Sequence, residues 1–132
     1  MNRPLQVLLI EDSEDDAVLL EIELQRAGYA PACHRVETPE ALSAALERLD
    51  WDLIISDYLL PRFDGLVALA MVKAKGLDVP FIMVSGYITE ETAVAAMKAG
   101  AHDYVMKDKL ARLGPAVERE LREAASRRER LP

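Results

Sequence analysis

The segment DLIISDYLLPRFDGL, residues 52–66, decides the fold of this 132-residue chain. Its first half is a short apolar run, Leu53–Ser56, that ends at Asp57. Because polar and apolar residues do not alternate in this run, it indicates a strand buried on both faces, as in a parallel sheet covered by helices. The second half contains Pro61 and Gly65, which predict a loop that leads into a helix.

The same succession of a short apolar run and a helical pattern recurs along the rest of the chain. Further strands are predicted at about residues 5–10, 29–36, 80–84 and 104–106. Helices are predicted at about residues 17–27, 38–49, 66–75 and 89–99, and a last helix begins near Leu110 or near Pro115. Strands that alternate with helices through short connections predict a doubly wound parallel sheet, which is an α/β fold.

The composition supports a single domain with a substantial core. Hydrophobic residues make up 51% of the chain and charged residues 30%, which excludes a disordered chain. We expect one domain over residues 1–132, with its core at about residues 5–125 and a charged tail at residues 126–132. The formal net charge of −7 disfavours nonspecific binding to nucleic acid or to an anionic membrane.

Other features of the sequence predict a cytoplasmic protein. The single cysteine, Cys33, excludes an internal disulfide and suits a reducing compartment. No apolar run has the ~18–20 residues needed to cross a bilayer, and the first residues do not resemble a signal peptide. Cys33 is predicted to be a small core residue, Trp51 to pack at the base of the sheet, and His34 and His102 to lie at the surface.

Side chains suited to a cation and a phosphate follow the predicted strands. In doubly wound sheets, ligands bind outside the carboxyl ends of the strands. Glu11 and Asp12 follow the first strand, Asp57 the third, Ser85 the fourth and Lys107 the fifth. Neighbouring carboxylates repel one another unless a cation lies among them, and oxygen ligands alone favour Mg²⁺ or Mn²⁺. A hydroxyl and an ammonium suit phosphoryl oxygens, so this edge predicts metal-assisted phosphoryl transfer to an aspartate.

Four motifs stand in the order found in a known family. They are Glu11-Asp12, the segment at residues 52–66, PFIMVSGY at residues 80–87 and AGAHDYVMK at residues 99–107. Together they resemble the receiver domain of bacterial response regulators over nearly the whole chain. The resemblance implies a flavodoxin-like sheet of parallel strands in the order 2-1-3-4-5. It also implies a two-component signalling switch that receives its phosphoryl group from a histidine kinase or a phosphotransfer protein.

The same resemblance implies a metal site at the phosphoacceptor. Asp57 corresponds to the aspartate that is phosphorylated. Glu11, Asp12 and Asp57 correspond to the side chains that bind Mg²⁺, together with the backbone carbonyl of Leu59. The protein is then not an enzyme, apart from slow removal of its own phosphoryl group.

The remaining motif residues correspond to the parts of a conformational switch. Ser85 and Lys107 correspond to the groups that bind phosphoryl oxygens. Tyr104 corresponds to the aromatic residue whose side chain follows the position of Ser85. The resemblance implies that this movement changes the surface of the predicted helix 89–99, the strand 104–106 and the last helix. An unknown downstream protein, or a second copy of the chain, would bind there.

Three residues near the site depart from the usual pattern or are unusually bulky. Asp108 follows Lys107 where most receivers have a proline after a cis peptide bond. A cis bond before a non-proline residue is unfavourable by ~3 kcal/mol or more, so we expect a trans bond or a rearranged loop. Leu59 and Tyr87 are bulky, and we expect them to hinder an attacking water and to lengthen the lifetime of the acyl phosphate.

The sequence leaves alternative functions open. The chain can be a stand-alone switch without an attached output domain, or a receiver fragment of a larger hybrid kinase or regulator. A docking module with the same fold but no phosphorylation is a second reading, which Asp108 keeps open. An aspartate-nucleophile phosphatase is disfavoured because Leu59 occupies the position of its second aspartate. Flavin or nucleotide binding is disfavoured because no glycine-rich loop follows the first strand.

Overall fold

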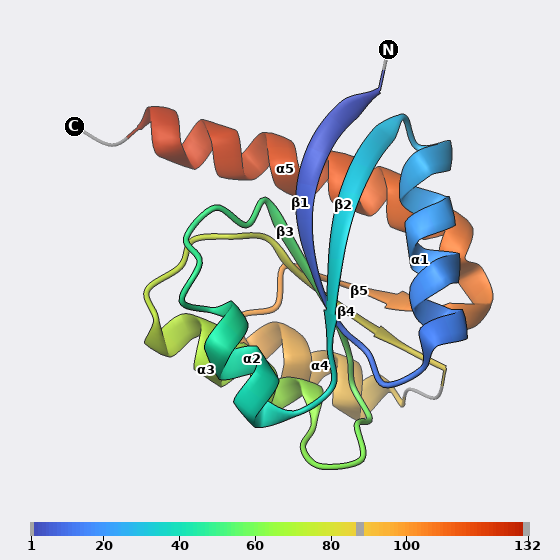
Figure 1. Ribbon diagram of the computed structural model, residues 1–132, viewed down its shortest axis with the longest axis vertical. Coiled ribbons are helices and arrows are strands. Elements are labelled where there is room, and N and C mark those ends of the chain that lie inside the picture. Colours follow the sequence, from blue (N-terminus) through green and yellow to red (C-terminus); the bar gives the residue numbers. More distant parts are fainter. Residues whose placement is uncertain (1, 87–88, 131–132) are drawn as a thin grey trace.

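A parallel sheet forms the centre of the computed structural model, which describes residues 2–86 and 89–130 (Figure 1). Its strands have the order β2-β1-β3-β4-β5, which confirms the predicted topology. In chain order the elements are β1 (Arg3–Ile10), α1 (Glu14–Arg26), β2 (Tyr29–Val36), α2 (Pro39–Ala45), β3 (Leu53–Asp57), α3 (Gly65–Ala74), β4 (Phe81–Ser85), α4 (Glu90–Ala99), β5 (Asp103–Met106), the 3₁₀ helix η1 (Lys107–Arg112) and α5 (Leu113–Glu129).

Helices cover both faces of the sheet. Figure 1 shows α1 and α5 on one side and α2, α3 and α4 on the other. The residues of β1 divide between the two cores: Val7 and Leu9 pack with α1 and α5, whereas Leu8 and Ile10 pack with the other three helices. This division follows from the two-residue period of a strand, and it explains why the central strands are apolar throughout.

Two helix ends differ from the sequence prediction, and tertiary contacts account for both. Helix α2 ends at Ala45 instead of Leu49, and its carbonyl at Ala45 accepts a hydrogen bond from Trp51 Nε1 at 3.0 Å. Helix α5 continues to Glu129, so most of the predicted tail is helical. Arg127 holds this last part by donating two hydrogen bonds to Asp78 at 3.1 and 3.3 Å.

The structure also tests the predicted positions of single residues. Trp51 is buried, as predicted, and His34 is exposed. Cys33 is half-buried and packs against the α1–α5 core, so it belongs to the edge of that core. The prediction for His102 is wrong: its ring is half-buried, and Nδ1 accepts a hydrogen bond from the Phe81 N–H at 3.0 Å. Burial lowers the pKa of His102, which favours the neutral ring that can accept this bond.

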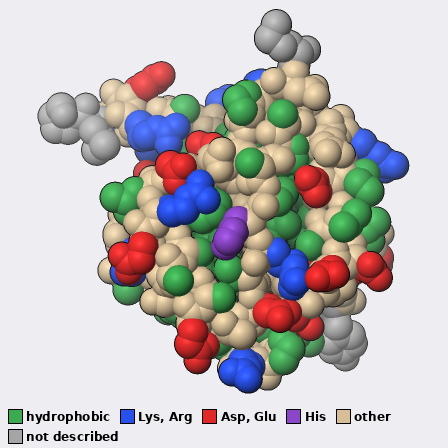
Figure 2. Space-filling model, in the orientation of Figure 1, with side chains coloured by type: hydrophobic (Ala, Val, Ile, Leu, Met, Phe, Trp, Pro, Cys, Tyr) green, Lys and Arg blue, Asp and Glu red, His purple; other side chains and the backbone are tan. Residues whose placement is uncertain are grey.

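Charge is distributed over the surface without separation by sign on the face that Figure 2 shows. Acidic and basic side chains are interspersed there. Within residues 2–86 and 89–130, no helix has the length and apolar character that a membrane crossing requires.

Gly65 allows α3 to begin directly beside the end of β3. A Cβ atom at this position would lie 2.8 Å from the carbonyl oxygen of Asp57 and would also collide with the side chain of Met83. The Gly65 N–H donates to the Tyr58 carbonyl at 2.8 Å, and Asp64 caps the helix through a 2.9 Å bond from the Val67 N–H. The loop after Asp57 is therefore held tightly against the sheet.

We predict that Gly65→Ala lowers the free energy of unfolding by about 1–3 kcal/mol, because the added methyl group overpacks this contact. Urea unfolding followed by circular dichroism measures the effect. Gly86→Ala is the matched control, since the nearest atom to its new Cβ would be Lys107 Cδ at an ordinary 3.8 Å. Equal urea midpoints for the two variants would contradict the prediction.

Candidate functional site

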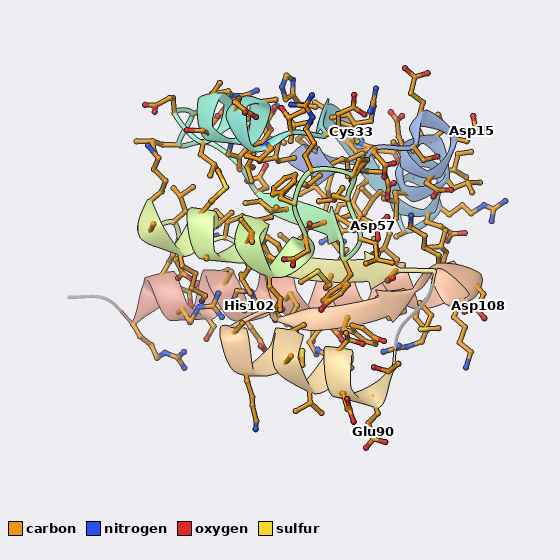
Figure 3. All side chains as sticks on the ribbon, turned by 90° about the horizontal axis from the view of Figure 1, so that it is seen from below. Asp15, Cys33, Asp57, Glu90, His102 and Asp108 are labelled. Carbon is orange, nitrogen blue, oxygen red and sulfur yellow. The ribbon has the colours of Figure 1, made fainter. Side chains whose placement is uncertain are left out.

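The carboxyl ends of four strands bring the predicted residues to one edge of the sheet. Asp57 ends β3 and Ser85 ends β4, while Glu11 directly follows β1 and Lys107 directly follows β5. In Figure 3, the labelled Asp57, Asp15 and Asp108 lie toward this edge, and His102 lies toward the opposite one. Residues that are far apart in sequence thus meet because parallel strands share a direction.

Lys107 is the cation around which the acidic residues gather. Its Nζ atom lies 2.9 Å from Glu11 Oε2, 2.7 Å from Asp16 Oδ2 and 2.8 Å from Asp57 Oδ2. Burial alone would lower the pKa of Lys107, but the three carboxylates outweigh it and raise the pKa above its usual value. The ammonium is therefore charged at any physiological pH and partly neutralises the cluster.

Glu11 is the most deeply buried acid of the site, with 1% of its surface exposed. Burial raises its pKa to about 7, and the negative charge of Asp57 acts in the same direction. The Lys107 ammonium and a 3.1 Å hydrogen bond from the Ser13 N–H oppose this rise. One positive charge is thus too little to make the ionised form of Glu11 as favourable here as it is in water.

Glu11, Asp12 and Asp57 fit a divalent cation. Each offers one carboxylate oxygen, and these oxygens lie within 4.8 Å of one another. Glu11 and Asp57 are buried and Asp12 is exposed, so the group is open to water on one side. An all-oxygen set of this kind suits Mg²⁺, which retains several waters when it binds to proteins.

The loop after β3 lies directly beside the Asp57 carboxylate. The Leu59 N–H donates to Asp57 Oδ1 at 3.3 Å, while the Leu59 side chain is 57% exposed. The role of the Leu59 carbonyl as a metal ligand stays a prediction. Tyr87, the second bulky residue expected here, lies outside the described residues.

Ser85 ends β4, and Tyr104 lies within the neighbouring strand β5. Ser85 is buried and pairs in register with Met106, and Tyr104 pairs with Met83. Tyr104 is half-buried, packs against the α2–α3–α4 core, and its hydroxyl lies 3.6 Å from Met106 Sδ. Burial raises the pKa of Tyr104, so its hydroxyl is neutral. The coupling of the two residues stays a prediction.

The connection after Lys107 agrees with the expectation drawn from Asp108. The described residues contain no cis peptide bond, so the bond between Lys107 and Asp108 is trans. The chain enters η1 at Lys107 instead of a proline-containing turn. The trans bond still presents the Lys107 ammonium to Asp57.

Two residues of this site are not among those predicted from the sequence. Asp16, in the first turn of α1, contacts Lys107. Arg35, at the end of β2, donates to the Glu11 carbonyl at 3.1 Å and to the Glu14 carboxylate at 3.3 Å. The signal for Asp16 is its place three residues after the N-cap Ser13, since first-turn side chains point back toward the strand end.

Comparisons with known proteins agree on one family. The family model described as "Response regulator receiver domain" matches residues 7–118. The transcriptional regulatory protein RprY of Bacteroides fragilis is 31% identical over 81% of this chain and 44% of its own length. The nitrogen assimilation regulatory protein NtrX of Azorhizobium caulinodans is 36% identical over 76% of this chain and 22% of its own length. The chain thus spans less than half the length of these relatives.

Solved structures show the same fold. A signal receiver domain from Vibrio parahaemolyticus has a TM-score of 0.82 and 27% identity, covering 94% of this chain and 95% of its own. The beryllofluoride-activated NtrC4 receiver domain dimer has a TM-score of 0.78 and 25% identity, covering 90% of this chain and 98% of its own.

We predict that Asp12→Asn weakens Mg²⁺ binding about tenfold or more, because it removes one of three ligand charges. Isothermal titration calorimetry measures the affinity directly. Asp15→Asn is the matched control: it removes the same charge from an exposed residue nearby that lies outside the group of three. Equal losses in the two variants would contradict a cation site at Asp12.

Proposed function

The chain belongs to the response regulator receiver domain family, and we propose that it is a phosphorylation-dependent switch of a two-component system. Asp57 accepts a phosphoryl group from a phosphohistidine of a histidine kinase or a phosphotransfer protein. The observation that carries this proposal is the convergence of Glu11, Asp57 and Lys107 in one cluster, beside the exposed Asp12. Such a cluster combines a nucleophilic carboxylate, ligands for a divalent cation and a fixed positive charge.

The residues of the site divide the work of the transfer. An oxygen of the Asp57 carboxylate attacks phosphorus, the phosphorus–nitrogen bond of the donor breaks, and the histidine leaves with the electron pair. Lys107 already lies 2.8 Å from Asp57, so it can bind a phosphoryl oxygen after a small movement. Ser85 binds a second phosphoryl oxygen. Glu11, Asp12 and Asp57 would hold Mg²⁺, which supplies neutralisation of the charge that develops on the phosphoryl group.

The output surface is the one that α4, β5 and α5 form beside the site. Movement of Ser85 toward the phosphoryl group leaves space that the Tyr104 side chain fills, and this changes the neighbouring surface. Two apolar side chains of α4 in that region, Val94 and Met97, are about half exposed. A shallow groove lined by Thr89, Glu90, Glu91 and Val94 adjoins them. We propose that a downstream protein, or a second copy of the chain, binds there.

The protein acts in the cytoplasm of a bacterium, where its kinase partners are found. Its activity does not extend to hydrolysis of external substrates, because Leu59 offers no proton donor at the position of a second acid. The curated relatives are longer than this chain, so a receiver fragment of a larger regulator is an alternative setting for the same switch.

We predict that incubation with acetyl phosphate and Mg²⁺ adds one phosphoryl group, measured as intact mass. The gain should be absent without Mg²⁺ and in Asp57→Asn, and present in the control Asp15→Asn. If acetyl phosphate gives no product, a candidate phosphorylated kinase replaces it as donor. A second blank would contradict phosphorylation and favour the docking module.

We predict that Leu59→Asn shortens the lifetime of the acyl phosphate by about threefold to tenfold, because the exposed leucine side chain hinders an attacking water. The measurement is loss of the phosphoryl mass with time after removal of the donor. Leu49→Asn is the control, since Leu49 is also exposed but lies after α2, at the other edge of the sheet. An unchanged lifetime in Leu59→Asn would rule out this role.

A further inference from the structure

Asp16 holds the ammonium of Lys107 from the side of α1. Its Oδ2 atom lies 2.7 Å from Lys107 Nζ, which is the shortest of the three ion pairs that this ammonium makes. The Asp16 side chain is 36% exposed, and the Lys107 side chain 19%. The contact joins residues 91 positions apart and so ties the start of α1 to the start of η1.

Asp16 differs from the other two partners of Lys107 in its relation to the metal. Within the described residues, the group whose oxygens can share one cation consists of Glu11, Asp12 and Asp57. Bound Mg²⁺ would therefore compete with Lys107 for Glu11 and Asp57, but not for Asp16. With Mg²⁺ bound and Asp57 unphosphorylated, Lys107 would keep its full ion pair with Asp16.

We propose that Asp16 is a positioning residue that holds Lys107 until a phosphoryl group arrives. This inference rests on the proposed function and identifies a residue that tunes it. Asp16 opposes the phosphorylated state in two ways. It competes with the phosphoryl oxygens for the ammonium, and it adds a negative charge beside the place where an anion must bind.

The test is the affinity for beryllofluoride, which mimics a phosphoryl group, in the presence of Mg²⁺. ¹⁹F NMR titration distinguishes the bound form from the free form. We expect Asp16→Asn to bind about threefold to tenfold more tightly than the wild type, the range for one partly exposed ion pair. Asp16→Glu, which keeps a carboxylate, should remain within about twofold of the wild type.

The matched control is Asp15→Asn, which removes the same charge from the same helix turn. Asp15 is exposed and is not among the carboxylates that contact Lys107. Equal effects of Asp15→Asn and Asp16→Asn, or weaker binding by Asp16→Asn, would overturn the inference. A wild type that binds no beryllofluoride would overturn it together with the proposed function.

A second measurement separates the contact itself from phosphorylation. In the metal-free protein, we expect Asp16→Asn to lower the urea midpoint. This loss should disappear or become a gain in a Lys107→Met background, where Asp16 would only repel the neighbouring carboxylates. The same cycle with Asp15→Asn should show no dependence on Lys107. An effect of Asp16→Asn that persists in Lys107→Met would show that Asp16 does not act through Lys107.

Discussion

The ion pairs of Lys107 are the interaction on which the site depends. Three carboxylates lie within 2.9 Å of its ammonium, and two of them are largely buried. Without a cation among them, these charges would repel one another and would favour protonation of Glu11. Lys107 therefore allows an acidic site to exist at this edge of the sheet, while leaving it attractive to a further cation.

The sheet makes this arrangement possible by directing strand ends to one place. Glu11, Asp57, Ser85 and Lys107 come from four parts of the chain and meet because the strands are parallel. The buried sides of the helices pack against both faces of these strands. Gly65 contributes to this arrangement, because a Cβ atom there would lie 2.8 Å from the carbonyl oxygen of Asp57, against which α3 begins. Packing thus fixes the positions of the backbone, and the carboxylate and ammonium groups at the strand ends determine which ions the site can bind.

Much of the fold and of the candidate site could be predicted from local sequence patterns. The strands are short apolar runs, and the capping residues Ser13, Thr38 and Thr89 begin three of the helices. The site residues followed from the rule that ligands bind at carboxyl ends of strands. The end of α2 could not be predicted, because the Trp51 indole donates to the carbonyl of its last residue. The full length of α5 could not be predicted either, because Arg127 near its end is held by Asp78. Asp16 was missed because it lies in the first turn of α1 and not at the carboxyl end of a strand, so the rule that selected the other residues did not select it.

The most direct test of this account is an experimental structure of the chain with Mg²⁺ and beryllofluoride. We expect beryllofluoride on an oxygen of Asp57, Mg²⁺ on Glu11, Asp12 and Asp57, and the Lys107 ammonium on a fluorine atom. Asp16 should then be farther from Lys107 than the present 2.7 Å. A Lys107 side chain that still pairs fully with Asp16, or beryllofluoride bound away from Asp57, would contradict the account.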